Sequence, residues 1–229
     1  MAEELRISID LVSDVVCPWC YVGQKRLEEA MALAPEVGVD LRWRPYQLDP
    51  TIPPEGLERD SYMKAKFGEG GRLEEMQVRL EEIGRDVGIV FHFGDITRSP
   101  NTLDAHRVIR WAASADGQNV QNAVAKRLFQ FYFEEGRDVG DRAVLIEAAR
   151  ECGMDATLVE TLLAAGADID EVKTEIDTAR RMGVTGVPCY LIENRYAVVG
   201  AQDAETLADA MRQVAAAKAR GELDAPVEG

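Results

Sequence analysis

Cys17 and Cys20, separated by two residues, are the side chains of this sequence best suited to chemistry. They follow an apolar run and stand at the predicted start of a helix, within the string SDVVCPWCYVG at 13–23. A cysteine pair at this spacing either exchanges disulfides or contributes half of a zinc site. The 229 residues include only four cysteines, too few for a disulfide scaffold at this length, so redox or metal chemistry is the better interpretation.

The predicted helix start assigns different roles to the two sulfurs. Disulfide exchange needs a thiolate, whereas a free cysteine is mostly a thiol at neutral pH. A helix N-terminus offers unpaired N–H groups and a partial positive charge, so the N–H groups of Trp19 and Cys20 are predicted donors to the sulfur of Cys17. Cys20 lies a turn further in and should be more buried and less ionised. We therefore predict that Cys17 is the nucleophile and that Cys20 resolves the mixed disulfide.

The neighbours of the pair set its predicted strength as an oxidant. Neither Pro18 nor Trp19 carries a positive charge, and the negative Asp14 opposes ionisation of Cys17. We therefore predict only a moderately acidic Cys17 and a reduction potential well short of that of a strong oxidant. Trp19 would also give the site an apolar rim for an unfolded substrate.

Zinc is the main chemical alternative at this pair. The side chains that could complete a zinc site are Cys152, Cys189, His92 and His106, but none of them forms a second closely spaced pair. We therefore expect no metal, and a purely structural disulfide is favoured less still. Cys189 is expected to be a buried small apolar residue, with a third thiol near the pair as the alternative.

The first elements of the chain form a βαβ unit around the pair. Apolar residues alternate over 5–11 and again over 39–45, which predicts two strands, and a helix is predicted over 18–34. Pro18 suits the first helical position because its missing N–H costs nothing there. The two strands should be parallel, and the pair would lie at their carboxyl ends, where open α/β sheets place their chemistry.

The rest of the chain predicts a helical insertion followed by the second half of the sheet. Residues 57–182 show mostly helical patterns, with a possible extended piece at 88–93 and a helix start near Ser99 or Asn101. Strands are predicted over 187–192 and 196–199, then a helix to about Ala219. We therefore predict an α/β fold with a mixed sheet of about four strands: residues 1–52 and 180–229 form one discontinuous domain, and residues 53–179 form an inserted helical domain.

Three strings together resemble a known family: DVVCPWCYVG at 14–23, SPNTLDAHR at 99–107 and GVTGVP at 183–188. With the order of the elements they resemble the thioredoxin fold, its DsbA-like branch with an all-helical insertion, and in particular the FrnE-type cytoplasmic dithiol–disulfide oxidoreductases. The resemblance implies a cis peptide bond between Val187 and Pro188, facing the cysteines. It also places Asn101 and His106 in a lid segment that could contact substrate or glutathione. Alternatively, Asn101 caps its helix and His106 is a satisfied core histidine.

The composition limits the partners. A net charge of −15 argues against binding to nucleic acid or to anionic membranes, because both repel an acidic protein. The first residues show no positively charged stretch before an apolar run, so a cytoplasmic protein is expected. A redox pair needs no further cofactor, so none is expected. The expected substrates are disulfide- or thiol-containing proteins, and the expected electron partner is thioredoxin or glutathione. Monomer and homodimer both remain open.

Two other functions compete with disulfide exchange. The 2-hydroxychromene-2-carboxylate isomerases and kappa-class glutathione transferases resemble this chain in architecture but use a serine where Cys17 stands. Two cysteines are superfluous for activating glutathione, so the pair favours redox chemistry. The other alternative is a redox-linked, chaperone-like binder whose groove holds unfolded chains.

Overall fold

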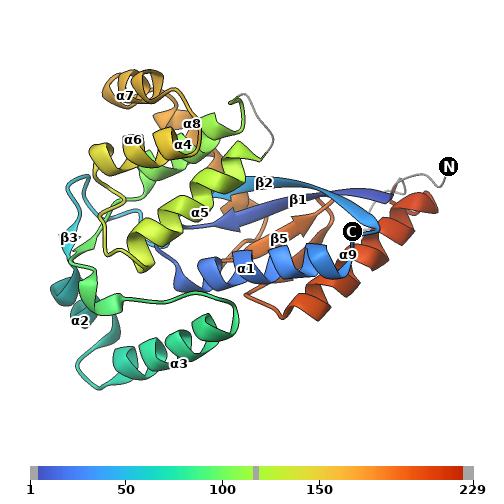
Figure 1. Cartoon of the computed structure of the whole chain (residues 1–229), viewed down its shortest axis with the longest axis horizontal. Helices are drawn as coiled ribbons and strands as arrows, with labels where there is room; N and C mark the ends of the chain where they lie inside the picture. Colours follow the sequence, from blue (N-terminus) through green and yellow to red (C-terminus); the bar gives the residue numbers. More distant parts are fainter. Residues whose placement is uncertain (1–4, 116–118, 224–229) are drawn as a thin grey trace.

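A four-stranded mixed sheet forms the centre of the protein, as predicted. The computed structural model describes residues 5–115 and 119–223, and the strand order in this sheet is β2-β1-β5-β6 (Figure 1). The strands are β1 (Leu5–Ser13), β2 (Val37–Pro45), β5 (Cys189–Ile192) and β6 (Tyr196–Val199). β2 pairs with β1 in parallel, and β5 and β6 are antiparallel to their neighbours. This is the order expected when a βαβ unit and a later hairpin share one sheet.

The two faces of the sheet are covered by different helices. Helices α1 (Pro18–Leu33) and α9 (Ala204–Ala219) lie side by side over one face (Figure 1). On the other face, Val12 and Cys189 pack with Ala179 of helix α8 (Ile169–Arg181). Leu11 and Val12 are adjacent in β1 and both fully buried, which shows that this strand is covered on both sides.

The helices between β2 and β5 form the predicted helical insertion of the DsbA-like thioredoxin fold. They are α2 (Arg59–Phe67), α3 (Arg72–Asp86), α4 (Leu103–Ala112), α5 (Val120–Phe133), α6 (Arg142–Glu151) and α7 (Ala156–Ala164), with α8 leading back to the sheet. Aromatic residues join the insertion to α1: the ring of Tyr21 stacks on Phe129 at 5.1 Å and lies 6.2 Å from that of Phe133. One core therefore spans the sheet and the helices, and the division into domains at residues 52 and 180 stays a prediction.

Local details of the insertion differ from the sequence predictions. Residues 88–93 are not a strand; Phe91 and Phe93 instead stack on each other at 4.9 Å and pack on Phe133. Two short strands, β3 (Leu57–Glu58) and β4 (Arg98–Ser99), pair where only helix and loop were predicted. Strands of two residues show no periodic pattern in the sequence. They can therefore be recognised only from their pairing in the folded protein.

The start of α4 also differs from the sequence prediction. Ser99 belongs to β4, so it does not cap the helix. The cap position is Thr102, and the Asn101 side chain accepts the N–H of Leu103 at 2.9 Å.

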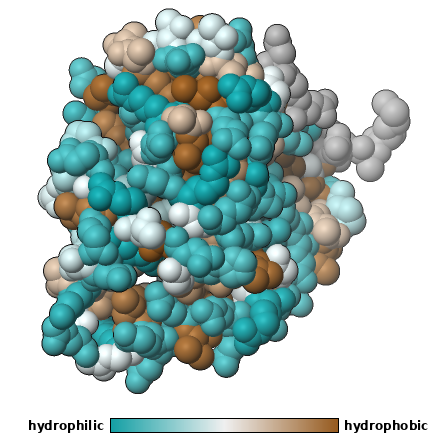
Figure 2. All heavy atoms as spheres, turned by 60° about the vertical axis from the view of Figure 1, so that its left-hand side comes forward, coloured by the Kyte–Doolittle hydropathy of each residue, from teal (hydrophilic) through white to brown (hydrophobic). Residues whose placement is uncertain are grey.

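The surface is mainly hydrophilic. Figure 2 shows one face on which hydrophobic residues occur in small separate groups among hydrophilic ones, in keeping with the net charge of −15. Among the described residues, no helix is both long and apolar enough to cross a membrane.

Candidate active site

Cys17 is the N-cap residue of α1, at the point where β1 gives way to the helix. Its backbone is extended (φ −93°, ψ 111°), and Pro18 occupies the first helical position, as predicted. The Cys17 N–H donates to the Asp14 carbonyl at 3.0 Å, closing the turn after β1. The turn places the first cysteine at the carboxyl end of the central strand and at the positive end of a sixteen-residue helix.

The Cys17 sulfur makes a contact other than the one predicted. No side-chain cap bond forms to Trp19 or Cys20, and the Cys20 N–H donates to the Cys17 carbonyl at 3.0 Å instead. The thiol donates to the backbone carbonyl of Val187 at 3.7 Å. A neutral thiol is a poor acceptor, so it donates to a carbonyl instead of accepting from the helix N–H groups.

Cys20 lies one helical turn further in and is fully buried. Burial raises the pKa of the Cys20 thiol well above its ordinary value, and the neighbouring Cys17 raises it further. Cys20 is thus more deeply buried than Cys17, which is 4% exposed, and is held as a thiol. This agrees with the expected asymmetry between the two sulfurs.

Pro188 packs closely against α1, the helix that begins at the cysteine pair. The Val187–Pro188 peptide bond is cis, as the resemblance implied, and Pro188 is buried. Gly23 makes the approach possible, because a Cβ atom there would lie 2.5 Å from the Tyr190 hydroxyl and 2.8 Å from the Pro188 ring. The Tyr190 hydroxyl donates to the Gly23 carbonyl at 2.9 Å. Gly23 was not predicted to belong to the site, although an isolated glycine within a helical pattern is a signal of close packing.

Asp14 and His106 form a buried pair beneath the turn. The Asp14 carboxylate accepts the Leu48 N–H at 2.8 Å and lies 3.4 Å from Nε2 of His106. That nitrogen also lies 2.8 Å from the Tyr46 carbonyl. A carbonyl only accepts, so Nε2 carries the proton. His106 therefore ties α4 to the active-site turn, and the prediction that it contacts substrate stays a prediction.

Asn101 is held by three hydrogen bonds within the chain. Besides accepting the Leu103 N–H, its side chain accepts from Gln47 at 3.1 Å and donates to the Ile52 carbonyl at 2.6 Å. These contacts fix the loop before α4 next to the crossing segment that follows β2. These bonds favour a structural role for Asn101 at the start of α4. The contact between Asn101 and substrate stays a prediction.

Comparison with known proteins agrees with this geometry. The family model for the DSBA-like thioredoxin domain matches residues 8–212, which include both cysteines and Pro188. The chain belongs to this family. Its mixed sheet and its helical insertion are thus those of a DSBA-like thioredoxin domain.

Three known proteins are similar to this chain over most of its length. A crystal structure of the probable DsbA oxidoreductase SCO1869 from Streptomyces coelicolor is 30% identical, with a TM-score of 0.82, covering 90% of this chain and 89% of that one. The cytosolic disulfide reductase DsbM from Pseudomonas aeruginosa, solved with GSH, is 20% identical with a TM-score of 0.60, covering 93% and 99%. YwbO of Bacillus subtilis (strain 168) is 24% identical over 196 residues, 82% of this chain and 88% of that protein.

The other two cysteines of this DSBA-like chain lie apart from the pair. Cys189 packs with Val12, Ala179 and Val184, on the sheet face away from α1. This is the buried apolar role expected for it, because successive strand residues point to opposite faces. Cys152 is half-buried at the end of α6. Burial raises the pKa of both thiols. Among the described residues, no three His, Cys, Asp or Glu side chains are grouped to hold a metal ion.

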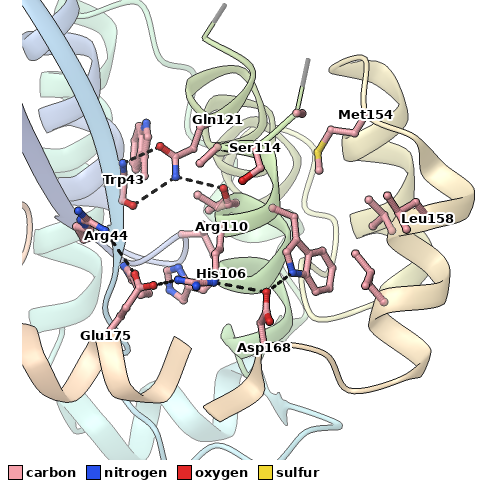
Figure 3. A pocket seen from close by; sticks show the side chains of 18 of the residues that line it. Trp43, Arg44, His106, Arg110, Ser114, Gln121, Met154, Leu158, Asp168 and Glu175 are labelled. Carbon is pink, nitrogen blue, oxygen red and sulfur yellow. Dashed lines mark hydrogen bonds and ion pairs between the residues drawn. The ribbon is translucent and has the colours of Figure 1, made fainter. Parts of the chain in front are cut away.

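A sizeable cavity of the protein does not contain the cysteine pair. It has a volume of about 730 Å³ and lies between β2, α4, α7 and α8 (Figure 3). Ser13, Val15 and His106 line it, whereas neither Cys17 nor Cys20 does. The cavity thus lies behind the active-site turn, bordered there by Ser13, Val15 and His106, and its lining does not include the sulfurs.

Proposed function

We propose that this chain is a thiol–disulfide oxidoreductase of the cytoplasmic FrnE type, with Cys17 and Cys20 as its redox pair. The main observation in support of this proposal is the position of the Cys17 and Cys20 sulfurs. Cys17 caps α1 and faces the Val187 carbonyl, while Cys20 is buried one turn behind it. The family and the three sequence strings support the same activity.

The proposed reaction is two successive thiol–disulfide exchanges. The Cys17 thiolate attacks one sulfur of a substrate disulfide, the substrate S–S bond breaks, and one substrate thiolate leaves. Cys20 then loses its proton and attacks Cys17 in the mixed disulfide, which releases the second substrate thiolate. Two electrons pass from the cysteine pair to the substrate, and a Cys17–Cys20 disulfide remains. The reverse sequence oxidises a dithiol substrate.

The surroundings of Cys17 suit a polypeptide disulfide flanked by apolar residues. Trp19, two residues after Cys17, is half-buried, and Leu48, which is 43% exposed, is bonded through its N–H to the active-site turn. Within the described residues the Val187 carbonyl accepts the weak S–H bond alone, so it is open to the backbone of an extended substrate. We propose proteins and small disulfides as substrates and glutathione or thioredoxin as the electron partner, with no further cofactor.

The test is a reduction assay on insulin and on glutathione disulfide, with three serine variants compared with the wild type. Cys17→Ser should abolish turnover, and Cys20→Ser should accumulate a mixed disulfide visible by mass spectrometry. Cys189→Ser is the matched control, because it also removes a buried thiol but lies on the other face of the sheet. Full turnover by Cys17→Ser would refute the proposal. Glutathione-dependent isomerisation that survives in Cys20→Ser would favour the isomerase alternative, and holding of unfolded chains by Cys17→Ser would favour the chaperone-like one.

A further inference from the structure

The cavity behind the active-site turn has the size of a small-molecule site. Its volume of about 730 Å³ falls within the range of about 300–1,000 Å³ that is usual for such sites. Its lining comes from β2, from helices α4, α5, α7 and α8, and from the end of β1 (Figure 3). The redox pair does not take part, so the cavity is open to a separate role.

Both arginines of the cavity lining already have carboxylate partners. Arg110 is paired with Glu175 and lies 3.5 Å from Asp168. Arg44 lies 3.8 Å from Glu175 and 3.2 Å from Asp10. A charged ligand would have to break one of these pairs and leave a half-buried charge without its partner, which is unfavourable. The wall formed by β2 and α8 therefore favours a neutral ligand.

The opposite wall carries apolar side chains that are incompletely covered. Leu158 and Met154 point into the open space in Figure 3, and Leu158 is 54% exposed. Trp111 donates its indole N–H to Asp168 at 2.8 Å, which fixes the ring in the cavity lining. Trp43 lines the inner end. Indole rings and a thioether are good partners for an aromatic ring.

The edge of β2 is closed to a peptide at this point. β2 is an edge strand, and such an edge would normally accept an added strand. The Gln121 side chain occupies it instead: its Oε1 accepts the Trp43 N–H at 3.0 Å, and its Nε2 lies 3.5 Å from the Trp43 carbonyl. The cavity thus favours a compact molecule over an extended polypeptide.

One buried nitrogen in the lining is free to accept a hydrogen bond. His106 is only 4% exposed and lines the cavity. Its Nε2–H is taken by the Tyr46 carbonyl, so Nδ1 carries a lone pair, and no hydrogen bond to Nδ1 occurs within the described chain. A ligand with an O–H or N–H group could supply the missing donor.

We propose that this cavity binds a neutral aromatic small molecule that carries a hydroxyl or N–H donor, at a site distinct from the cysteine pair. The aromatic ring would lie against Trp111, Met154 and Leu158, and the donor would bond to His106. This inference does not depend on the proposed redox activity.

The test uses 2-naphthol as probe and equilibrium dialysis of the full chain as measurement. We expect saturable binding of one 2-naphthol per chain, several-fold weaker binding of naphthalene, which lacks the donor, and at least about tenfold weaker binding of the anionic 2-naphthoate. Alkylation of Cys17 with iodoacetamide should leave the affinity for 2-naphthol unchanged. Absence of saturable binding, a preference for 2-naphthoate, or loss of binding on alkylation would each overturn the proposal.

Two tryptophan variants locate the binding site. Leu158→Trp fills the cavity from an exposed position on α7 and should weaken 2-naphthol binding by at least about tenfold, equivalent to about 1.4 kcal/mol. Val78→Trp is the matched control: Val78 is 55% exposed on α3 and is absent from the cavity lining. His106→Phe should remove the advantage of 2-naphthol over naphthalene. Equal binding by wild type and Leu158→Trp would contradict the site assignment.

Discussion

Helices α1 and α6 begin in opposite ways. At α6, the Asp141 carboxylate accepts the Ala143 N–H at 2.8 Å, and the helix end is capped by its own sequence. At α1, the N-cap is Cys17, which makes no side-chain cap bond and whose thiol points to Val187 instead. The cap bond stabilises α6, whereas α1 lacks such a bond. The N-terminal end of α1 can instead stabilise a thiolate at Cys17.

Replacing Cys17 should show the difference between the two helix ends most clearly. Cys17→Ser is nearly isosteric and provides a good N-cap residue in place of a poor one. We expect disulfide reductase turnover to fall at least about a thousandfold, while the free energy of unfolding of the reduced protein rises by about 0.5–1 kcal/mol. Insulin reduction and urea titration of the same samples measure both. A variant that loses activity and stability together would show that Cys17 is mainly a packing residue.

The contact between α1 and the Pro188 strand should be the next most sensitive point. Gly23→Ala forces a methyl group against the Tyr190 hydroxyl and the Pro188 ring, so we expect a loss of about 1–3 kcal/mol in unfolding free energy. Gly94→Ala is the control, because a Cβ there would meet no atom within 4 Å. Thermal and urea unfolding compare the two, and an equal effect of both substitutions would show that the close approach at Gly23 is unimportant.

Much of this arrangement can be predicted from the sequence, and the missing part has a physical reason. The βαβ unit, the position of Cys17 at a helix start and the burial of Cys20 follow from local patterns of apolar residues and from Pro18. The contact of Gly23 with Tyr190 and the Asp14–His106 pair depend on how distant segments dock. The direction of the Cys17 thiol differs from the prediction because a neutral thiol needs an acceptor, and the Val187 carbonyl that provides it comes from a distant segment.

Alkaline pH should destabilise the reduced protein through the buried Cys20. Its pKa is raised in the folded state, so the native protein holds this proton more tightly than the unfolded chain does. The stabilisation is complete below the cysteine pKa of the unfolded chain, about 8.5, and is lost by up to about 1.4 kcal/mol per pH unit above it.

Cys20→Ala isolates this contribution from those of other buried groups. Burial also raises the pKa of Cys189 and of Tyr132, the latter to about 12, so the wild type should lose stability at high pH for several reasons. The difference between wild type and Cys20→Ala, measured by urea unfolding in reductant from pH 7 to 10, should shrink as the pH rises. A constant difference would mean that Cys20 is not held as a thiol.

Removing the cap of α6 should have the smallest effect and complete the comparison. Asp141→Ala should lower the unfolding free energy by about 1 kcal/mol and leave disulfide reduction unchanged, because this helix end is not part of the active site. Glu160→Ala, an exposed carboxylate within α7, is the control and should change stability very little. Altered turnover in Asp141→Ala would show that the two helix ends are coupled.

The reduction potential of the Cys17–Cys20 couple is the most direct test of the redox assignment. The protein is equilibrated with glutathione buffers, quenched by alkylation, and analysed by mass spectrometry. We predict one two-electron transition between the values of thioredoxin, about −270 mV, and protein disulfide isomerase, about −180 mV, because no positive charge lies between the two cysteines. A pair that forms no disulfide in any buffer would contradict the redox assignment, and a value near −120 mV would contradict the predicted moderate potential.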